Sequence, residues 1–265
     1  MFDYEFMRNA FVAAALVAIV AGCTGYFLVL RAQTFAGHAL AHVGFAGATG
    51  AVLLGISPLW GMLLISAGGG AGMGLLGERL EGRDVAIGIV LAVSLGIGLL
   101  FLHFYTSYAA QAAALLFGNL LAVDRATILV LAGLTALSLL ALGALSRPLL
   151  FATLQPELAE AKGVPLRTLS VLFLVIVAIV TAECAQIVGV LLVFGLMVAP
   201  AAAAQRLTRR FAWGVINSML LALADAWLGL WLAYRTDWPS SFWIVALGAL
   251  TYLIAVMAAP HAHTS

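Results

Sequence analysis

Residues 85–104 read VAIGIVLAVSLGIGLLFLHF, an unbroken apolar run that contains no Asp, Glu, Lys or Arg. A helix needs about 20 apolar residues to cross the hydrocarbon core of a bilayer, so this run is long enough to span a membrane. The composition extends that conclusion to the whole chain, because 65% of its 265 residues are hydrophobic and only 9% are charged. The chain is therefore predicted to be an integral membrane protein.

Further apolar runs lie on both sides of this one, each bounded by charge, Pro or Gly. They cover residues 9–30, 38–56, 59–77, 126–145, 169–182, 187–204, 211–234 and 241–259. The pattern predicts an all-α polytopic bundle of eight or nine transmembrane helices, forming a single transmembrane domain over residues 1–265. Two pieces are short for a span: residues 169–182, and residues 109–123, which have the length of a re-entrant or interfacial segment.

The distribution of basic residues suggests an orientation. With nine spans, the N-terminus lies outside and the C-terminus inside. The cytoplasmic basic residues are then Arg31, Arg79, Arg83, Arg147, Lys162, Arg167, Arg206, Arg209 and Arg210, which leaves Arg8, Arg125 and Arg235 outside. Most of the basic residues thus face the cytoplasm, as the positive-inside rule expects.

Several function classes are excluded by what the sequence lacks. It has no phosphate-binding loop, since its single lysine, Lys162, is followed by Gly163 and Val164, so any energy-coupling domain must be another chain. It has no metalloprotease His-Glu-x-x-His, no Gly-x-Ser-x-Gly and no paired catalytic carboxylates, so an enzyme is not predicted. A net charge of +1 provides no basic field for nucleic acid. Cys23 and Cys184 are interpreted as small core residues.

The longest polar interruption of the chain runs over residues 146–168. Within it, Pro156 is placed to open a short helix, and Glu157 follows in the first turn, where the helix dipole favours a carboxylate. Gly163 comes at the end of this helix and Pro165 prevents its continuation. We expect a separate amphipathic helix along the cytoplasmic surface, with a plain loop as the alternative.

Two histidines, His38 and His42, stand four residues apart in an apolar segment. On a helix this spacing places both rings on one face, one turn apart, where they can bind a single ion. Neutral imidazoles suit zinc or another borderline transition metal, and an incomplete coordination sphere suits a transport site, which must release its ion. The structural alternative is that each ring hydrogen-bonds a backbone carbonyl or a hydroxyl at a helix interface.

Two acids, Glu183 and Asp225, also lie among apolar residues. Either could neutralise a cation in a path through the membrane or pair with an arginine. If residues 169–182 form a span, Glu183 lies at its outer mouth, where an ordinary interfacial carboxylate is expected. Asp225 lies deeper in its run, and its partner is not evident from the sequence.

Several motifs occur in order along nearly the whole chain. They are residues 37–42 (GHALAH), 116–123 (LFGNLLAV), 156–159 (PELA) with 163–165 (GVP), and 188–192 (VGVLL) running to 199–203 (APAAA). In this combination the chain resembles the membrane permeases of zinc, manganese and iron ATP-binding-cassette importers. The resemblance implies a homodimer with a translocation path at its centre, two cytoplasmic ATPase subunits and an extracytoplasmic metal-binding protein that delivers the ion.

The same resemblance assigns roles to particular segments. The cytoplasmic coupling helix, which docks on the ATPase, would lie at about residues 156–165 and include Pro156, Glu157, Leu158, Ala161, Gly163, Val164 and Pro165. Residues 189–200 would line or brace the path. No cofactor would be bound permanently, because the divalent metal ion is the cargo and ATP binds to the partner subunit.

One position departs from the family pattern, since these permeases usually carry Asp where this chain has His38. Two imidazoles shift the preference toward zinc, whereas a carboxylate with an imidazole suits manganese equally well. The sequence therefore predicts a metal-ion permease, with zinc first and manganese or iron as other candidates. The alternatives are a permease for a metal chelate or cobalamin and a structural membrane protein that transports nothing.

Overall fold

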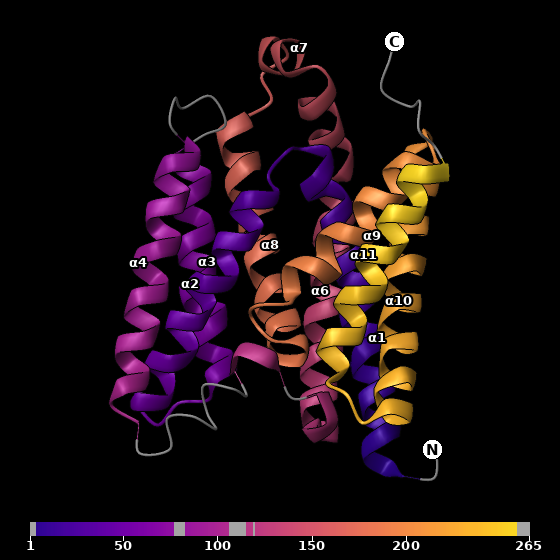
Figure 1. The fold of residues 1–265 in the computed structure, drawn as a ribbon. Coiled ribbons are helices and arrows are strands. Elements are labelled where there is room, and N and C mark those ends of the chain that lie inside the picture. Colours follow the sequence, from indigo (N-terminus) through magenta and orange to yellow (C-terminus); the bar gives the residue numbers. More distant parts are fainter. Residues whose placement is uncertain (1–3, 77–82, 106–114, 119, 259–265) are drawn as a thin grey trace.

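The computed structural model describes residues 4–76, 83–105, 115–118 and 120–258. These residues form a bundle of long helices (Figure 1). In chain order the elements are α1 (Glu5–Leu30), α2 (Thr34–Leu53), α3 (Pro58–Leu75), α4 (Arg83–His103), the 3-10 helix η1 (Leu120–Ala122), α6 (Arg125–Leu154), α7 (Pro156–Ala161), α8 (Leu166–Val188), α9 (Val193–Leu207), α10 (Phe211–Thr236) and α11 (Ser240–Ala258).

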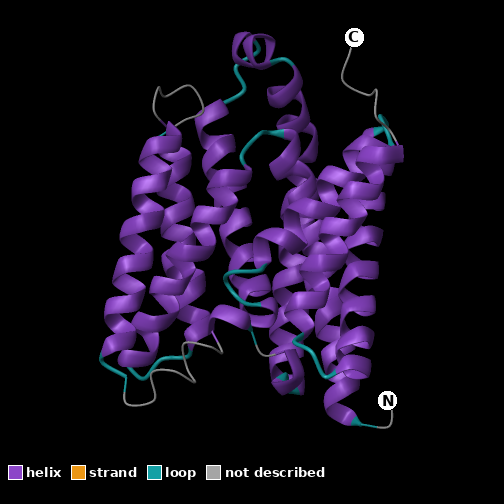
Figure 2. Cartoon of the chain, viewed as in Figure 1, coloured by secondary structure: helices purple, strands orange, loops and turns teal. Residues whose placement is uncertain are grey.

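The predicted all-α class is confirmed, because the described residues contain helices and loops but no strand (Figure 2). Among the described residues, six helices are long and apolar enough to cross a membrane, namely α1, α4, α6, α8, α10 and α11. In addition, α2 has 20 residues and α3 has 18, and they pack against each other and against α4 and α8. Eight long helices therefore agree with the predicted eight or nine spans.

Two groups of helices make up the bundle. In the first, α2, α3, α4 and α8 pack together, and in the second α1, α9, α10 and α11 do so, while α6 packs on both α1 and α8. Contacts between α2 and α9 are sparse, so a seam separates the groups on this side. The short helix α7 lies at one end of the bundle and the start of α1 lies at the other (Figure 1). We refer to these as the α7 end and the N-terminal end.

Two predicted spans were drawn with the wrong limits near the end of the chain. The run 169–182, which looked short for a span, belongs to α8, a helix of 23 residues. The run 187–204 is not one helix, because α8 ends at Val188 and α9 begins only at Val193. The interruption has no charge or proline to mark it, so hydropathy alone joined the two pieces.

The predicted polar interruption 146–168 is also shorter than expected. Helix α6 has 30 residues and continues through Pro148 to Leu154. Proline removes one backbone hydrogen bond from a helix, which is why an end was expected there. Beyond Pro148 the guanidinium of Arg31 donates to the carbonyl oxygen of Leu149 at 3.4 Å and to Oγ1 of Thr153 at 3.0 Å, and these bonds hold the last turns of α6 against the end of α1.

The expected re-entrant or interfacial segment 109–123 is only partly described. Residues 109–114 and 119 lie outside the described residues. Residues 115–117 form a single helical turn, and η1 follows after Gly118. The described part contains no helix of spanning length, which agrees with either form of the prediction.

Candidate metal path

The two histidines lie in the first turns of α2, on one face, as their spacing predicts. Their ring centroids are 5.0 Å apart, and the ring planes stand at 87° to each other. His42 is buried, with 5% of its surface exposed, whereas His38 is half-buried. A third ring, that of Phe194 in the first turn of α9, packs on His38 at 5.2 Å between centroids, across the seam between the two helical groups.

The imidazole nitrogens bear on the structural alternative. The Nδ1 atoms of His38 and His42 are both buried, and neither has a hydrogen-bond partner among the described residues. A buried polar atom without a partner is costly, so native proteins rarely leave one unsatisfied. The alternative in which Nδ1 hydrogen-bonds a carbonyl or hydroxyl is therefore not seen. The two rings retain nitrogen atoms whose lone pairs could bind a metal ion.

Glu183 is buried within α8, whereas an ordinary interfacial carboxylate at the mouth of a span would be exposed. The side chain is fully buried between α8 and α6, because α8 continues for more than a turn beyond it. Its Oε1 atom accepts a hydrogen bond of 2.5 Å from the hydroxyl of Thr135, and Oε2 has no partner among the described residues. This contact joins the two helices that flank α7.

Asp225 has the partner that the sequence did not reveal. It is 4% exposed in α10, and its Oδ1 atom accepts a hydrogen bond of 2.9 Å from Thr251 of α11. The expected alternatives were a cation in the path or an arginine, but the contact seen is to a hydroxyl. Within the described residues, no three His, Cys, Asp or Glu side chains gather as a metal site, so the structure does not unite either acid with the His pair in such a cluster.

The break between α8 and α9 lies inside the bundle rather than at either end (Figure 1). It turns on Gly189, whose φ of 94° is one that a residue with a side chain rarely adopts. The freed backbone groups are paired with the helical turn before η1: the N–H of Val190 donates to Leu115 at 3.3 Å, and that of Leu191 donates to Leu116 at 3.2 Å. Broken helices with satisfied backbone groups are typical of transporter binding sites.

The predicted short helix over residues 156–165 is confirmed as α7, which covers Pro156–Ala161. Pro156 occupies its first turn together with Glu157. Ala159 is buried and anchors the helix, whereas Leu158 is 45% exposed. Gly163, Val164 and Pro165 follow as the connection to α8, and Ala161 is exposed. The helix thus presents an apolar side chain at the end of the bundle, where a partner could bind.

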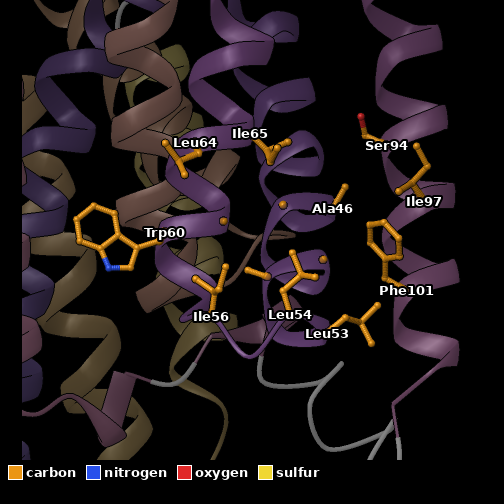
Figure 3. Close-up of a pocket in the computed structure, with 14 residues that line it drawn as sticks. Ala46, Leu53, Leu54, Ile56, Trp60, Leu64, Ile65, Ser94, Ile97 and Phe101 are labelled. Carbon is orange, nitrogen blue, oxygen red and sulfur yellow. The ribbon is translucent and has the colours of Figure 1, made fainter.

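A large cavity lies elsewhere and does not include the His pair. It has a volume of about 560 Å³ (Figure 3). It is lined by the second half of α2, the first half of α3 and the second half of α4. Leu64, Ile97 and Phe101 are typical of its lining, and Ser94 is the one hydroxyl side chain among the described residues that line it. It offers none of the nitrogen, sulfur or carboxylate ligands that transition metals prefer.

A polytopic helical bundle with a broken helix, an imidazole pair beside the break and a short surface helix defines a membrane transport subunit as the class of protein. The model of the ABC 3 transport family matches residues 3–259. The chain belongs to this family. It is therefore a multi-pass membrane permease subunit and not an enzyme, and the ATPase is a separate subunit.

Known relatives agree over nearly the full length. The manganese import system permease protein ScaB of Streptococcus parasanguinis is 30% identical over 269 residues, covering 97% of this chain and 92% of that protein. The solved structure of PsaBC from Streptococcus pneumoniae in complex with Fab matches with a TM-score of 0.87 and 27% identity, covering 97% of this chain and 93% of that chain. A metal-chelate type ABC transporter in an inward-facing conformation matches with a TM-score of 0.77 over 95% of this chain and 85% of that chain, and at 17% identity it shows the fold alone.

The sequence missed three residues that the structure places at these sites. Phe194, Thr135 and Thr251 each contact a predicted site residue from a different helix. Each contact joins segments far apart in the chain, so spacing within one helix carries no signal for it. Thr135 and Thr251 carry hydroxyl groups inside apolar runs, and this feature could have identified them as candidate partners for the two acids.

Proposed function

We propose that this permease imports a divalent transition-metal ion, zinc first, through a path that includes His38 and His42. The observation that carries the proposal is the pair of adjacent imidazole rings in a chain of the ABC 3 transport family, both with buried Nδ1 atoms that have no hydrogen-bond partner in the described part of the chain. Zinc binds neutral imidazole well and accepts an incomplete sphere of protein ligands. Two ligands one turn apart would hold such an ion only transiently, which a transport step requires.

The choice of ion follows from ligand chemistry and is open to direct test. Relatives such as ScaB are named for manganese. Manganese favours oxygen ligands, but neither Glu183 nor Asp225 gathers with the two histidines into a metal site among the described residues. With imidazoles at both positions 38 and 42, zinc is the better match, while manganese and iron are the competitors in the assay.

The partners follow from the family and from α7. We infer that α7 couples the permease to its cytoplasmic ATPase subunits, that an extracytoplasmic metal-binding protein delivers the ion, and that two copies of the chain form the path. In this orientation the α7 end faces the cytoplasm. Basic residues support it, since Arg31, Lys162, Arg206 and Arg210 all lie at or beside helix ends on the α7 side.

Uptake of zinc by cells that depend on this importer tests the site. We expect His38→Ala and His42→Ala to reduce uptake at least tenfold while expression and assembly with the ATPase remain normal. The matched control is His103→Ala, because His103 is an exposed histidine at the end of α4, outside the proposed path. Competition by manganese, ferrous iron and a zinc chelate ranks the cargo. Normal zinc uptake by both variants would remove His38 and His42 from the path.

A further inference from the structure

The contact between Phe194 and His38 is where α9 reaches across the seam to the His pair. The ring planes stand at 71°, an edge-to-face arrangement, and Phe194 is the second residue of α9. Since α2 and α9 have few contacts in all, this aromatic pair is one of the contacts that join them across the seam. Edge-to-face pairs at such separations are attractive beyond the area that they bury.

The position of Phe194 is set by the break at Gly189. A turn over residues 190–192 leads into α9, and the N–H groups of Leu192 at 3.2 Å and Val193 at 3.1 Å bond it back to the carbonyl oxygen of Gly189. On the other side of Gly189, α8 runs from the break back to the connection with α7. A displacement of α8 therefore reaches the first turn of α9 through Gly189 and the short turn 190–192, which is also bonded to the helical turn before η1.

The residue at position 38 makes this contact possible. An imidazole presents an aromatic ring to Phe194, whereas the aspartate expected from the family pattern has no ring to offer. The same ring must supply a lone pair to a metal ion, and its Nδ1 atom is buried in the present arrangement although the residue as a whole is only half-buried. Packing against Phe194 and binding a metal ion thus make competing demands on the His38 ring.

We propose that Phe194 is the gate over the His38–His42 pair. In the state seen here its ring closes the pair on the α9 side, and an ion reaches His38 when the first turn of α9 moves away about Gly189. The gate rests on the proposed function, because it controls access to the metal pair assigned there. Its occupant is a bare divalent ion, since the gate is one side chain wide.

The experiment uses the assembled importer, with its ATPase and metal-binding protein, in nanodiscs and in proteoliposomes. Zinc affinity is measured without nucleotide, and passive zinc flux is measured without ATP. Phe194→Ala removes the gate, and Phe194→Leu keeps apolar bulk should the alanine variant fail to assemble. Phe104→Ala is the matched control, because Phe104 packs edge-to-face on another histidine, His103, at 5.6 Å, outside the proposed path.

Loss of one aromatic pair changes an equilibrium by about 2- to 12-fold. We expect Phe194→Ala to bind zinc more tightly by about that factor and to pass zinc without ATP, with Phe194→Leu changed in the same direction and Phe104→Ala unchanged. In a His38→Ala background, Phe194→Ala should no longer alter zinc affinity.

Two results overturn the gate and can be told apart. If both Phe194 variants assemble, bind zinc as the parent does and show no passive flux, while His38→Ala and His42→Ala abolish uptake, the gate is refuted and the metal pair stands. If the histidine variants take up zinc normally, the metal pair is refuted and the gate with it.

Discussion

Removal of the Thr135 hydroxyl should destabilise the protein only while Glu183 is present. The two side chains are 5% and 0% exposed, and their hydrogen bond of 2.5 Å joins α6 to α8. Thr135→Val would leave the carboxyl group with neither oxygen paired within the described residues. Leaving a buried acceptor unsatisfied costs about 1–3 kcal/mol, and hydrogen bonds between membrane helices contribute up to about 1.7 kcal/mol.

A double-mutant cycle isolates this contact. In the parent, Thr135→Val should reduce the free energy of unfolding by about 1–3 kcal/mol. In a Glu183→Leu background, where the acid is gone, the same change should cost less than about 0.5 kcal/mol, giving a coupling energy of about 1–2 kcal/mol. Reversible unfolding in mixed micelles provides the measurement.

Ser138 provides the control on the same helix, one turn from Thr135. It is 2% exposed, and its hydroxyl has no partner among the described residues, so Ser138→Ala should change stability little in either background. Equal destabilisation by Thr135→Val with and without Glu183 would show that the hydrogen bond between α6 and α8 contributes nothing.

Two further predictions concern the backbone. Gly189→Ala forces a side chain into a conformation with φ of 94° and brings its Cβ against the carbonyl oxygen of Leu116. We expect the free energy of unfolding to fall by more than about 2 kcal/mol in the same assay, and a variant as stable as the parent would contradict the broken helix. At the start of α6, hydrogen bonds from the Thr127 side chain and backbone hold the pKa of Asp124 below its ordinary value. The ionised cap therefore stabilises the folded state above about pH 4, and this stabilisation is lost as the pH falls through the folded-state pKa. The stability difference between the parent and Asp124→Ala should therefore be present at pH 7 and shrink toward pH 3, and a difference independent of pH would exclude an ionised cap.

The sequence predicted features that depend on local chemistry. Pro156, the acids after it and Pro165 are all local signals, and they located α7 within a few residues. The spacing of His38 and His42 predicted a shared helical face, which the ring separation of 5.0 Å bears out. In both cases the deciding interactions lie within one turn of helix, so the order of residues contains the information.

Features that depend on tertiary contacts were not predictable in the same way. The break at Gly189 exists because Leu115 and Leu116 accept hydrogen bonds from residues more than 70 positions later in the chain, and hydropathy does not report such pairing. Helix α6 passes Pro148 because its far turns are held from another helix by Arg31. Glu183 is buried because α8 continues to Val188, whereas the apolar run 169–182 placed the end of the helix before Glu183.

The length of α6 has a mechanical consequence. At 1.5 Å per residue its 30 residues measure about 45 Å, roughly 15 Å more than the hydrocarbon core of a bilayer. The Arg31 bonds hold the last turns of α6 as ordered helix, and α7 follows directly after them. A tilt of 10° about the middle of this helix would move its end sideways by about 4 Å, so a small change in the angle of α6 becomes a displacement of α7 as large as the spacing of neighbouring side chains.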